Sequence, residues 1–309
     1  MSSDTALAGA RRILVIKLGA FGDFLLALGP MQALRRFRPD AHITLLTTRP
    51  YHALAEASGI FDTILLDDRP GRFDLTGWLD LRRQLRATRP DFVVDLQTSD
   101  RSGFYRLLLL PDRPFWSGIA RGSSHPHANA GRDHMHTVER QAEQMAMAGL
   151  PTGSVSLSDL SFLTADIAHF ALPDRFMLLV PGGAPHRPDK RWPAERYGSY
   201  AARQVLRGIT PIIIGTEAER QAAETILAME PAAISLLGRT SYAQIAALAR
   251  KAVSALGNDT GPMHLIALSG CPATVLFSNA SDPALCRPRG PSVRVIREPD
   301  LRDLIDIRS

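Results

Sequence analysis

The sequence predicts an α/β protein built from two doubly wound parallel sheets, and three observations support this. Short apolar runs alternate with longer segments of helical periodicity, as expected when buried strands are covered by helices. This alternation occurs once in each half of the chain. Between the halves lies a segment, 149–159, in which Pro, Gly, Thr and Ser cluster without apolar periodicity, which is typical of a linker. We therefore expect two domains, residues 1–160 and 161–309.

In the first half, residues 12–17 predict a buried strand, followed by a turn at 18–23 and a helix to about Arg36, which Pro30 should kink. Further strands are expected at 42–47, 63–66 and 92–96, and further helices at 51–57, 75–87 and 136–148. Residues 116–132 are rich in Gly, Ser, His and Pro and are predicted to form a long surface loop. We interpret His125 and His127 as loop residues and not as metal ligands.

The second half repeats the pattern. Strands are expected at 176–180, 210–215, 233–237, 253–256 and 273–277, and helices at 194–206, 218–229, 242–251 and 263–269. Two such domains facing one another would form a cleft at the carboxyl ends of their strands, where open α/β sheets bind ligands.

Composition excludes several classes of protein. An apolar content of 45% and a charged content of 22% are those of a soluble globular protein, and no run of eighteen apolar residues occurs. The first ten residues lack signal-peptide features, so we expect a cytoplasmic protein. Cys271 and Cys286 are in no paired motif and are expected to be reduced. The net charge of +5 suits anionic substrates, nucleic acid or an acidic membrane, but nucleic-acid motifs are absent and no such partner is expected.

Residues 257–264 predict a tight turn between a buried strand and a helix. Backbone NH groups of Thr260, Gly261 and Met263 would point out of the helix start, where the helix dipole also favours an anion. The alternative is that Asp259 or Thr260 only caps the helix. From these eight residues alone, a phosphate site and a plain helix cap are about equally supported.

Two other strand ends of the second half carry charged residues. Lys190 and Arg191 precede a helix and could neutralise a diphosphate leaving group, although a short basic pair is commonly a solvated loop. Glu217 and Glu219 follow the next strand, where either could bind ribose hydroxyls or merely charge the helix start. Together with the turn at 257–264, three strand ends of one domain thus carry groups suited to a nucleotide diphosphate.

The turn of the first domain has different chemistry. It lacks the spacing of a dinucleotide fingerprint, so an NAD-dependent reductase is disfavoured, and it also lacks the lysine and hydroxyl of a P-loop. It carries one carboxylate, Asp23, at the start of a helix. Asp23 could be a general base for a hydroxyl nucleophile, but spacing alone favours the alternative of a helix cap.

Several motifs in order along the chain resemble the heptosyltransferases of glycosyltransferase family nine, which have the GT-B architecture of two facing Rossmann-like domains. The motifs are Gly22-Asp23 with Pro30, Asp95-Leu96-Gln97, Pro181-Gly182, Lys190-Arg191-Trp192-Pro193, Leu237-Gly238-Arg239-Thr240-Ser241 and Asn258-Asp259-Thr260-Gly261-Pro262-Met263-His264. The resemblance covers nearly the whole chain. Its first turn departs from the family, because the Ser or Thr with Arg of many members is replaced by Leu18, Gly19 and Ala20.

This resemblance implies inverting transfer of a heptose from ADP-heptose to a hydroxyl of a lipopolysaccharide core sugar, at the cytoplasmic face of the inner membrane. It implies that Asp23 is the general base and that Lys190 lies near the donor phosphates, with no cofactor besides the nucleotide sugar and no catalytic metal. The implied donor-binding residues are Lys190, Arg191, Glu217 or Glu219, Gly238, Thr240, Asp259, Thr260, Gly261 and His264. For His264, a role in helix packing stays equally open.

Acceptor and membrane contacts are harder to assign. Arg101, just past a strand end, could bind an acidic group of a lipid-linked saccharide acceptor. Arg82, Arg83 and Arg86 could contact anionic lipid at the inner-membrane surface, although a solvated helix face is the simpler interpretation. Two alternatives to the heptosyltransferase remain: an enzyme of the same fold with another nucleotide sugar or a non-lipopolysaccharide acceptor, and a nucleotide-sugar-binding protein without turnover.

Overall fold

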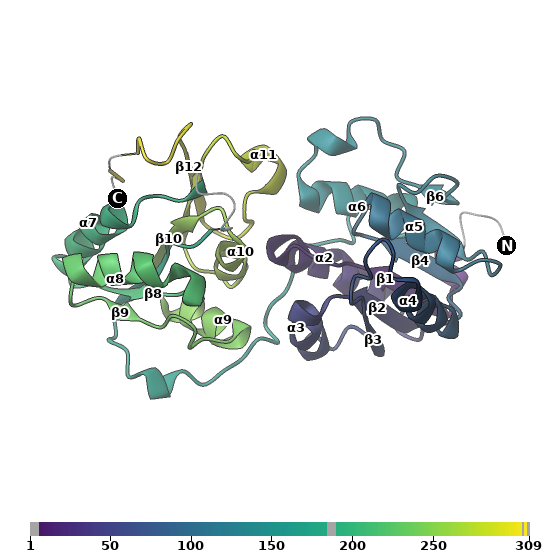
Figure 1. Ribbon diagram of the computed structural model, residues 1–309, viewed down its shortest axis with the longest axis horizontal. Helices are drawn as coiled ribbons and strands as arrows, with labels where there is room; N and C mark the ends of the chain where they lie inside the picture. Colours follow the sequence, from purple (N-terminus) through teal and green to yellow (C-terminus); the bar gives the residue numbers. More distant parts are fainter. Residues whose placement is uncertain (1–5, 184–189, 305, 308–309) are drawn as a thin grey trace. The chain divides into compact units, whose positions relative to one another are not determined.

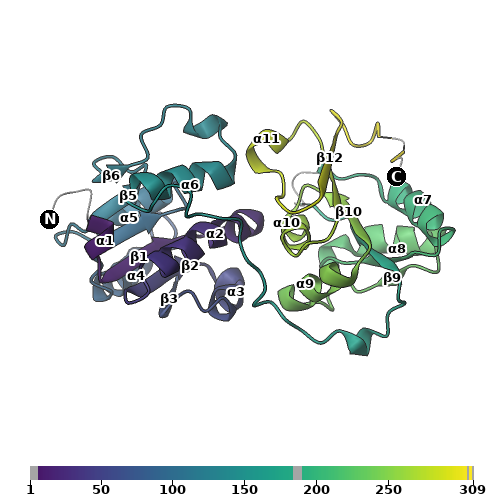
Figure 2. The ribbon, with the colours of Figure 1, turned by 180° about the vertical axis from the view of Figure 1, so that it is seen from behind.

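The computed structural model describes residues 6–183, 190–304 and 306–307. The chain divides into two compact units, Met1–Asp159 and Leu160–Ser309. Each unit contains one six-stranded sheet in which all neighbouring strands are parallel, with helices packed against it (Figures 1 and 2). The predicted α/β class with two doubly wound sheets is confirmed.

The first unit has strand order β3-β2-β1-β4-β5-β6, the order of a dinucleotide-binding sheet. Its strands are β1 (Arg12–Ile16), β2 (His42–Thr47), β3 (Thr63–Leu66), β4 (Phe92–Asp95), β5 (Phe115–Gly118) and β6 (His125–Pro126). Its helices are α1 (Ala6–Gly9), α2 (Phe21–Phe37), α3 (His52–Ala57), α4 (Leu75–Ala87), α5 (Asp100–Leu108) and α6 (Thr137–Met147). Helices α4 and α5 cover one face of this sheet through a shared apolar core that includes Leu85, Tyr105 and Leu14.

The predicted surface loop at 116–132 is wrong in its first part. Residues of β5 and β6 extend the sheet there, with Ser117 in register with His125, and Trp116 is fully buried. His125 and His127 are buried as well, and the His127 ring lies 2.8 Å from a carboxylate oxygen of Glu143. Strands of four and two residues among Gly, Ser and His are too short to give an alternating pattern, which is why the sequence did not reveal them.

Helix α2 continues through Pro30, the residue at which a kink was predicted. Proline has no NH to donate to the carbonyl of Leu26, and the hydroxyl of Ser158 lies 3.4 Å from that oxygen while donating to Leu25 O at 2.5 Å. The same hydroxyl accepts from the NH of Gly29 at 2.9 Å. A side chain at position 29 would collide with this segment, since a Cβ there would lie 2.3 Å from Ser156 O. The predicted linker, residues 149–159, is thus hydrogen-bonded to α2 through Ser158.

The second unit has strand order β12-β11-β10-β7-β8-β9, the same topology as the first. Its strands are β7 (Phe176–Val180), β8 (Thr210–Ile213), β9 (Ile234–Ser235), β10 (Ser254–Asn258), β11 (Ala273–Phe277) and β12 (Val293–Arg297). Its helices are α7 (Ala194–Val205), α8 (Arg220–Met229), α9 (Tyr242–Lys251), α10 (Gly261–Leu268) and α11 (Pro283–Cys286). Within the described residues, no helix has the length and apolar content needed to cross a membrane.

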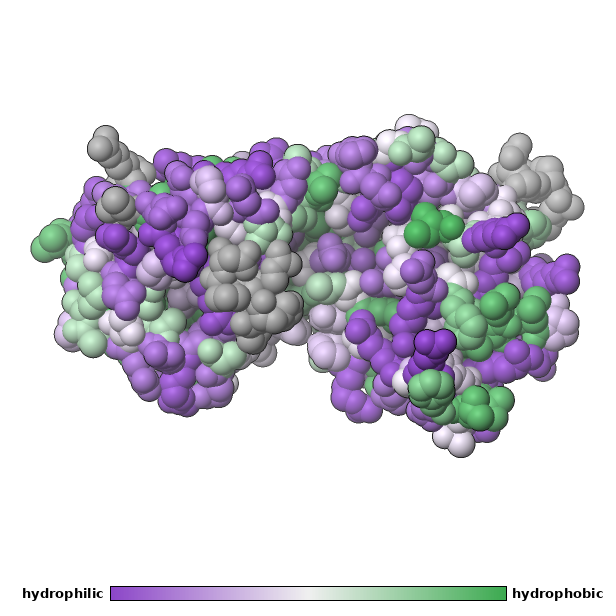
Figure 3. All heavy atoms as spheres, turned by 45° about the horizontal axis from the view of Figure 1, so that its top comes forward, coloured by the Kyte–Doolittle hydropathy of each residue, from purple (hydrophilic) through white to green (hydrophobic). Residues whose placement is uncertain are grey.

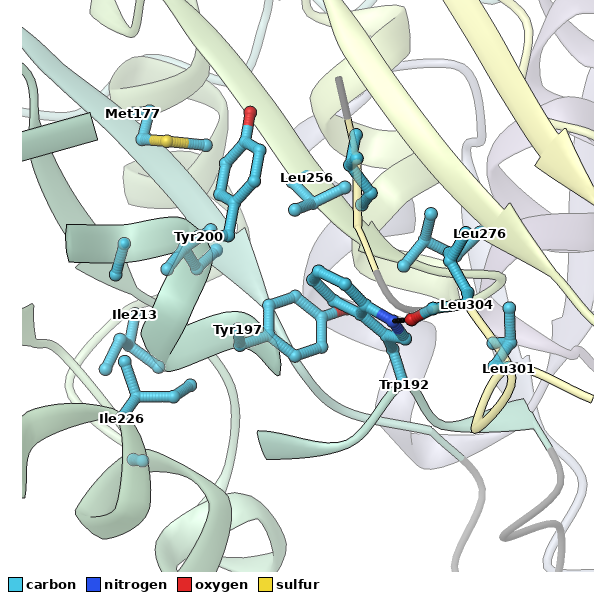
Figure 4. Close-up of a cluster of buried hydrophobic side chains, with 14 residues drawn as sticks. Met177, Trp192, Tyr197, Tyr200, Ile213, Ile226, Leu256, Leu276, Leu301 and Leu304 are labelled. Carbon is cyan, nitrogen blue, oxygen red and sulfur yellow. Dashed lines mark hydrogen bonds between the residues drawn. The ribbon is translucent and has the colours of Figure 1, made fainter. Parts of the chain in front are cut away.

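One core cluster of the second unit positions the segment that contains Lys190. Trp192 packs among residues of α7, α8, the sheet and the C-terminal segment, with its ring 4.9 Å from that of Tyr197 (Figure 4). The indole NH donates to Leu304 O at 2.7 Å. Because this large side chain is 2% exposed and hydrogen-bonded, it fixes the position of the backbone at Arg191 and Lys190, directly before it.

Candidate active site

A pocket of about 470 Å³ lies in the second unit at the carboxyl ends of β7, β8 and β10. These strands are neighbours, and the chain changes direction across the sheet between β7 and β10, the place where open α/β sheets bind ligands. The lining residues are Val180, Gly182, Gly183, Lys190, Gly215, Thr216, Glu219, Asp259, Thr260, Gly261 and Pro262. Five residues predicted to bind a donor are therefore in one pocket: Lys190, Glu219, Asp259, Thr260 and Gly261.

The pocket is held together by Asn258, the last residue of β10. Its buried amide donates to Pro181 O and Gly182 O, both at 2.9 Å. Its Oδ1 accepts from the backbone NH of Trp192 at 3.1 Å and from the hydroxyl of Tyr197 at 3.0 Å. All hydrogen-bonding capacity of one amide is thereby used to join the end of β7 to the segment before α7.

Lys190 and Asp259 form an ion pair inside the pocket. Lys190 Nζ lies 2.9 Å from Asp259 Oδ2, and the two side chains are only 17% and 9% exposed. The hydroxyl of Ser281 donates to the same oxygen at 2.7 Å. Because a carboxylate repels a phosphate, this geometry suits Asp259 to holding Lys190 in place, with the ammonium as the group that meets an anion.

The start of α10 offers a second place for an anion. Thr260 is the N-cap, but its side chain makes no capping hydrogen bond. Its hydroxyl is buried and has no partner among residues 6–183, 190–304 and 306–307. A buried hydroxyl is costly to leave unpaired, and it stands where the helix dipole favours negative charge. The predicted free NH of Met263 is wrong, because that group donates to Thr260 O at 3.1 Å.

Glu219, and not Glu217, lines the pocket. Its carboxylate accepts from the backbone NH and the hydroxyl of Thr216, both at 2.8 Å. A Cβ at Gly182 would come within about 3.0 Å of the Glu219 side chain, so glycine is needed there for this close approach. Glu217 is exposed and forms an ion pair with Arg220. Sequence alone left the choice between the two glutamates open, and the structure places only Glu219 at the pocket.

The other predicted donor residues lie outside the pocket lining. Arg191 donates from Nη2 to Gly183 O at 2.6 Å. His264 is buried in α10 and is 6% exposed. Gly238, with a positive φ of 65°, joins the ends of β8 and β9 by donating to Gly215 O at 2.9 Å, and Thr240 follows two residues later. Ala184, which follows the Pro181-Gly182 turn, and Asp189, which precedes Lys190, lie outside the described residues.

Asp23 lies in the first turn of α2 in the first unit. The N-cap of that helix is Ala20, so Asp23 is not the capping residue that its spacing favoured. Burial lowers the pKa of the Lys17 ammonium, and the nearby carboxylates of Asp23 and Asp95 oppose that shift. Burial also lowers the pKa of Arg140 on α6, and Asp23 opposes this too. The carboxylate of Asp23 is therefore within electrostatic reach of two partly desolvated cations.

A second carboxyl in this neighbourhood is buried at the end of β4. Burial raises the pKa of Asp95 to about 6, although Oδ1 accepts from the backbone NH groups of Gln97 and Thr98 at 3.0 Å. Lys17 Nζ donates to Leu96 O at 3.3 Å, directly beside it. Lys17 is thus within electrostatic reach of two acidic groups, the buried Asp95 and the half-buried Asp23.

A pocket of about 570 Å³ borders the turn that precedes Asp23. It is lined by Leu18, Gly19, Ala20, Thr48, Arg49, Pro50, Tyr51, Asp67, Asp68, Arg69 and Gln97. The guanidinium groups of Arg49 and Arg69 are candidates for an acidic ligand, and sequence reasoning missed both. Arg101 is instead engaged within the fold, because Nε donates to Tyr105 OH at 2.6 Å and the group lies 5.0 Å from the Trp78 ring. Its proposed contact with an acceptor stays a prediction.

Comparison with known proteins decides the family. The sequence model of glycosyltransferase family 9 (heptosyltransferase) matches residues 78–308, about three quarters of the chain. The chain belongs to this family. It is thus a glycosyltransferase of GT-B fold.

The relatives of this family 9 glycosyltransferase have low sequence identity to it but align with most of its length. Lipopolysaccharide heptosyltransferase 2 of Salmonella typhimurium is 24% identical over 93% of this chain and 88% of its own. The structure of a family 9 glycosyl transferase from Veillonella parvula is 22% identical, with a TM-score of 0.80 over 93% of this chain and 86% of that one. The E. coli heptosyltransferase WaaC with ADP has a TM-score of 0.74 at 20% identity, over 95% and 96% of the two chains.

Within this glycosyltransferase, the most informative residue that sequence reasoning missed is Asn258. It was noticed only as part of a motif. A polar residue that ends a buried strand was the available signal, because an amide at such a position must find hydrogen-bond partners. For Arg49 and Arg69 no local signal existed, since Arg49 begins a single 3-10 turn, Arg49–Tyr51, and Arg69 lies in a loop, and neither segment has a distinctive pattern.

Proposed function

We propose that this glycosyltransferase is an inverting heptosyltransferase that uses ADP-heptose as donor and a lipid-linked sugar of the lipopolysaccharide core as acceptor. The observation that carries the proposal is the pocket of the second unit, in which Lys190, Glu219 and Thr260 converge from three strand ends. Its volume suits a nucleotide sugar of ordinary size. The names of the relatives support the choice of heptose and of the lipopolysaccharide core.

In this proposal the donor diphosphate meets the ammonium of Lys190, the hydroxyl of Thr260 and the start of α10. Charge develops on the leaving diphosphate as the glycosidic bond breaks, so a fixed cation and helix dipole there stabilise the transition state. Glu219 is the proposed acid for ribose hydroxyls, since a carboxylate oxygen can accept further hydrogen bonds. Asp259 acts as a positioning residue for Lys190.

Asp23 is the proposed general base. Inversion requires a single displacement, in which the acceptor oxygen attacks the anomeric carbon while its proton moves to the base. A carboxylate near neutral pH is in the correct state to accept that proton. Lys17 and Arg140 are both within electrostatic reach of Asp23, so their positive charges can orient its carboxylate. We place this reaction in the cytoplasm, as the resemblance to the heptosyltransferases implies.

Calorimetry with ADP, UDP and GDP tests the donor assignment. The wild-type chain should prefer ADP. Lys190→Ala should weaken ADP binding roughly tenfold to a hundredfold, because a charge-assisted hydrogen bond to phosphate is lost. Lys251→Ala is the matched control, since Lys251 is the exposed lysine at the end of α9 and should bind ADP normally. A clear preference for UDP would reject ADP-heptose as donor while leaving the glycosyltransferase assignment intact.

A further inference from the structure

One surface of the first unit gathers most of the large apolar side chains that the described residues expose. Of twelve such residues, seven fall between positions 73 and 119, so their distribution is clustered and not scattered. They are Phe73, Leu75, Leu79, Phe104, Leu107, Leu110 and Ile119, and we call this group with its neighbouring arginines the α4–α5 surface. In Figure 3 hydrophobic patches set among hydrophilic residues are visible on the first unit, at the right of the view.

These residues form a continuous surface. Leu75 and Leu79 are four positions apart on α4, and Phe104 of α5 contacts Trp78 of α4 at a ring distance of 5.2 Å. At the other end, Arg82 of α4 donates to Leu110 O at 2.8 Å. Exposure is high, reaching 89% at Phe73. Exposed apolar patches of this kind commonly mark interaction sites.

The charges interleaved with these side chains are predominantly positive. Seven arginines belong to the surface, namely Arg72, Arg82, Arg83, Arg86, Arg106, Arg113 and Arg121, against four aspartates, namely Asp74, Asp80, Asp100 and Asp112. Two of those aspartates are already paired, Asp80 with Arg83 and Asp112 with Arg86. Five arginines then remain against two aspartates, Asp74 and Asp100, so the net charge beside the exposed leucine and phenylalanine side chains is positive.

A pocket at one end of the surface combines both kinds of group. It has a volume of about 620 Å³, and its lining includes Arg106, Arg121, Leu107 and Ile119 together with one carboxylate, that of Asp100, so two positive charges stand against one negative charge. Arg106 donates from Nη1 to Arg121 O at 3.1 Å, which keeps its guanidinium at the pocket wall. Two guanidinium groups next to two aliphatic side chains match the phosphate and the acyl boundary of a phospholipid.

We propose that the α4–α5 surface is a docking site for an anionic phospholipid bilayer, with the pocket at Arg106 and Arg121 receiving a headgroup phosphate. Apolar side chains enter the headgroup and acyl boundary, and the arginines meet the negative surface potential. Charge complementarity selects this occupant, because a protein interface would be expected to have fewer charges at its centre. This inference rests on the proposed function in one respect: binding to a bilayer would bring the enzyme to its lipid-linked acceptor.

Vesicle co-sedimentation of the full chain tests this surface. Binding should be strong for vesicles of phosphatidylcholine with phosphatidylglycerol, weak for phosphatidylcholine alone, and should fall with added salt. The double variant Arg106→Gln/Leu107→Ser should reduce partitioning about tenfold or more, from the loss of one charge and one apolar contact. The matched control Leu206→Ser/Arg207→Gln changes the same kinds of exposed neighbours in the second unit, where Leu206 is 88% exposed, and should bind as wild type.

A second double variant, Leu75→Ser/Leu79→Ser, tests the same surface if Arg106→Gln/Leu107→Ser does not fold. Circular dichroism verifies that each variant is folded. Equal binding to both vesicle types, or wild-type binding by both α4–α5 variants, would overturn the proposal. So would sedimentation velocity showing a dimer that only the α4–α5 variants dissociate, because the surface would then bind a second copy. ADP calorimetry on the same variants should be unchanged, so a failure here is separate from a failure of the donor assignment.

Discussion

Asn258→Ala tests whether the hydrogen bonds of this residue stabilise the donor pocket, without removing a group that is proposed to contact the donor. Asn258 touches no proposed ligand. Its amide makes four hydrogen bonds, to Pro181 O and Gly182 O and from Trp192 and Tyr197. Each is worth about 1 kcal/mol net, and the buried partners left behind remain unpaired. The free energy of unfolding should therefore fall by about 4 kcal/mol, or about 2 kcal/mol if water enters the space.

Asn258→Asp refines this expectation. The aspartate keeps the size of the side chain and one acceptor oxygen, but it places a second acceptor against the carbonyls of Pro181 and Gly182. Loss of stability at neutral pH should be at least as large as for alanine, because two acceptors then face a buried charge. Acid should restore part of it, since a protonated carboxyl can donate one hydrogen bond.

Urea unfolding followed by circular dichroism measures the loss, and hydrogen exchange resolved to peptides assigns it to one unit, since a chain of two units need not unfold in one step. Exchange should accelerate in 176–183 and 190–201 and not in the first unit. Asn279→Ala, an exposed asparagine in a loop of the same unit, is the control and should stay within about 0.5 kcal/mol of wild type. A loss below about 1 kcal/mol for Asn258→Ala, with exchange unchanged, would refute the reasoning.

Three other changes test the first unit. Asp23→Ala should lower sugar transfer about 10²-fold to 10⁴-fold and leave calorimetric ADP binding unchanged, and undiminished transfer would remove Asp23 as the base. Gly29→Ala should lower the free energy of unfolding, measured by thermal melts, by about 1–3 kcal/mol, because the added methyl would meet Ser156 O. Gly71→Ala is the control and should be neutral, because the space around Gly71 is open. Burial raises the pKa of Asp95 from 3.8 to about 6, so the folded chain keeps a proton that the unfolded chain releases between those values. Stability should then decrease by up to about 3 kcal/mol as pH rises through that window, and urea titrations of Asp95→Asn should lack this decrease.

The fold was predictable from the sequence where elements are long and regular. Buried strands such as Phe176–Val180 are continuous apolar runs, and helices such as α4 carry a clear apolar stripe. The sequence failed at β5 and β6, whose buried Trp116 and His125 stand among loop-forming residues, and at α5 and β12. Strands this short owe their existence to an adjacent sheet edge, which local sequence does not describe.

The candidate site was predictable to the level of strand ends and no further. Because parallel strands present their carboxyl ends at one edge, Lys190, Glu219 and Thr260 could be expected together from element order alone. Which side chains face the pocket depends on tertiary pairing. Glu217 pairs with Arg220, and Arg191 turns to Gly183 O, so both leave a pocket that their positions would have let them enter.

The ion pair in the pocket explains why the cation there is a lysine in a chain whose basic residues are almost all arginine. The ammonium of Lys190 is already paired with Asp259 at 2.9 Å, so it can bind an entering diphosphate only with the donors that this pair leaves free. An ammonium on a flexible stem has three donors and can meet Asp259 and a phosphate oxygen together. A guanidinium would form a planar two-point contact with the carboxylate, and its remaining donors would be held in that plane and could not turn toward the ligand as those of an ammonium can. In the proposed function, therefore, Asp259 does not oppose donor binding. It holds the stem of Lys190 at the pocket and leaves the remaining donors of the ammonium for the leaving group.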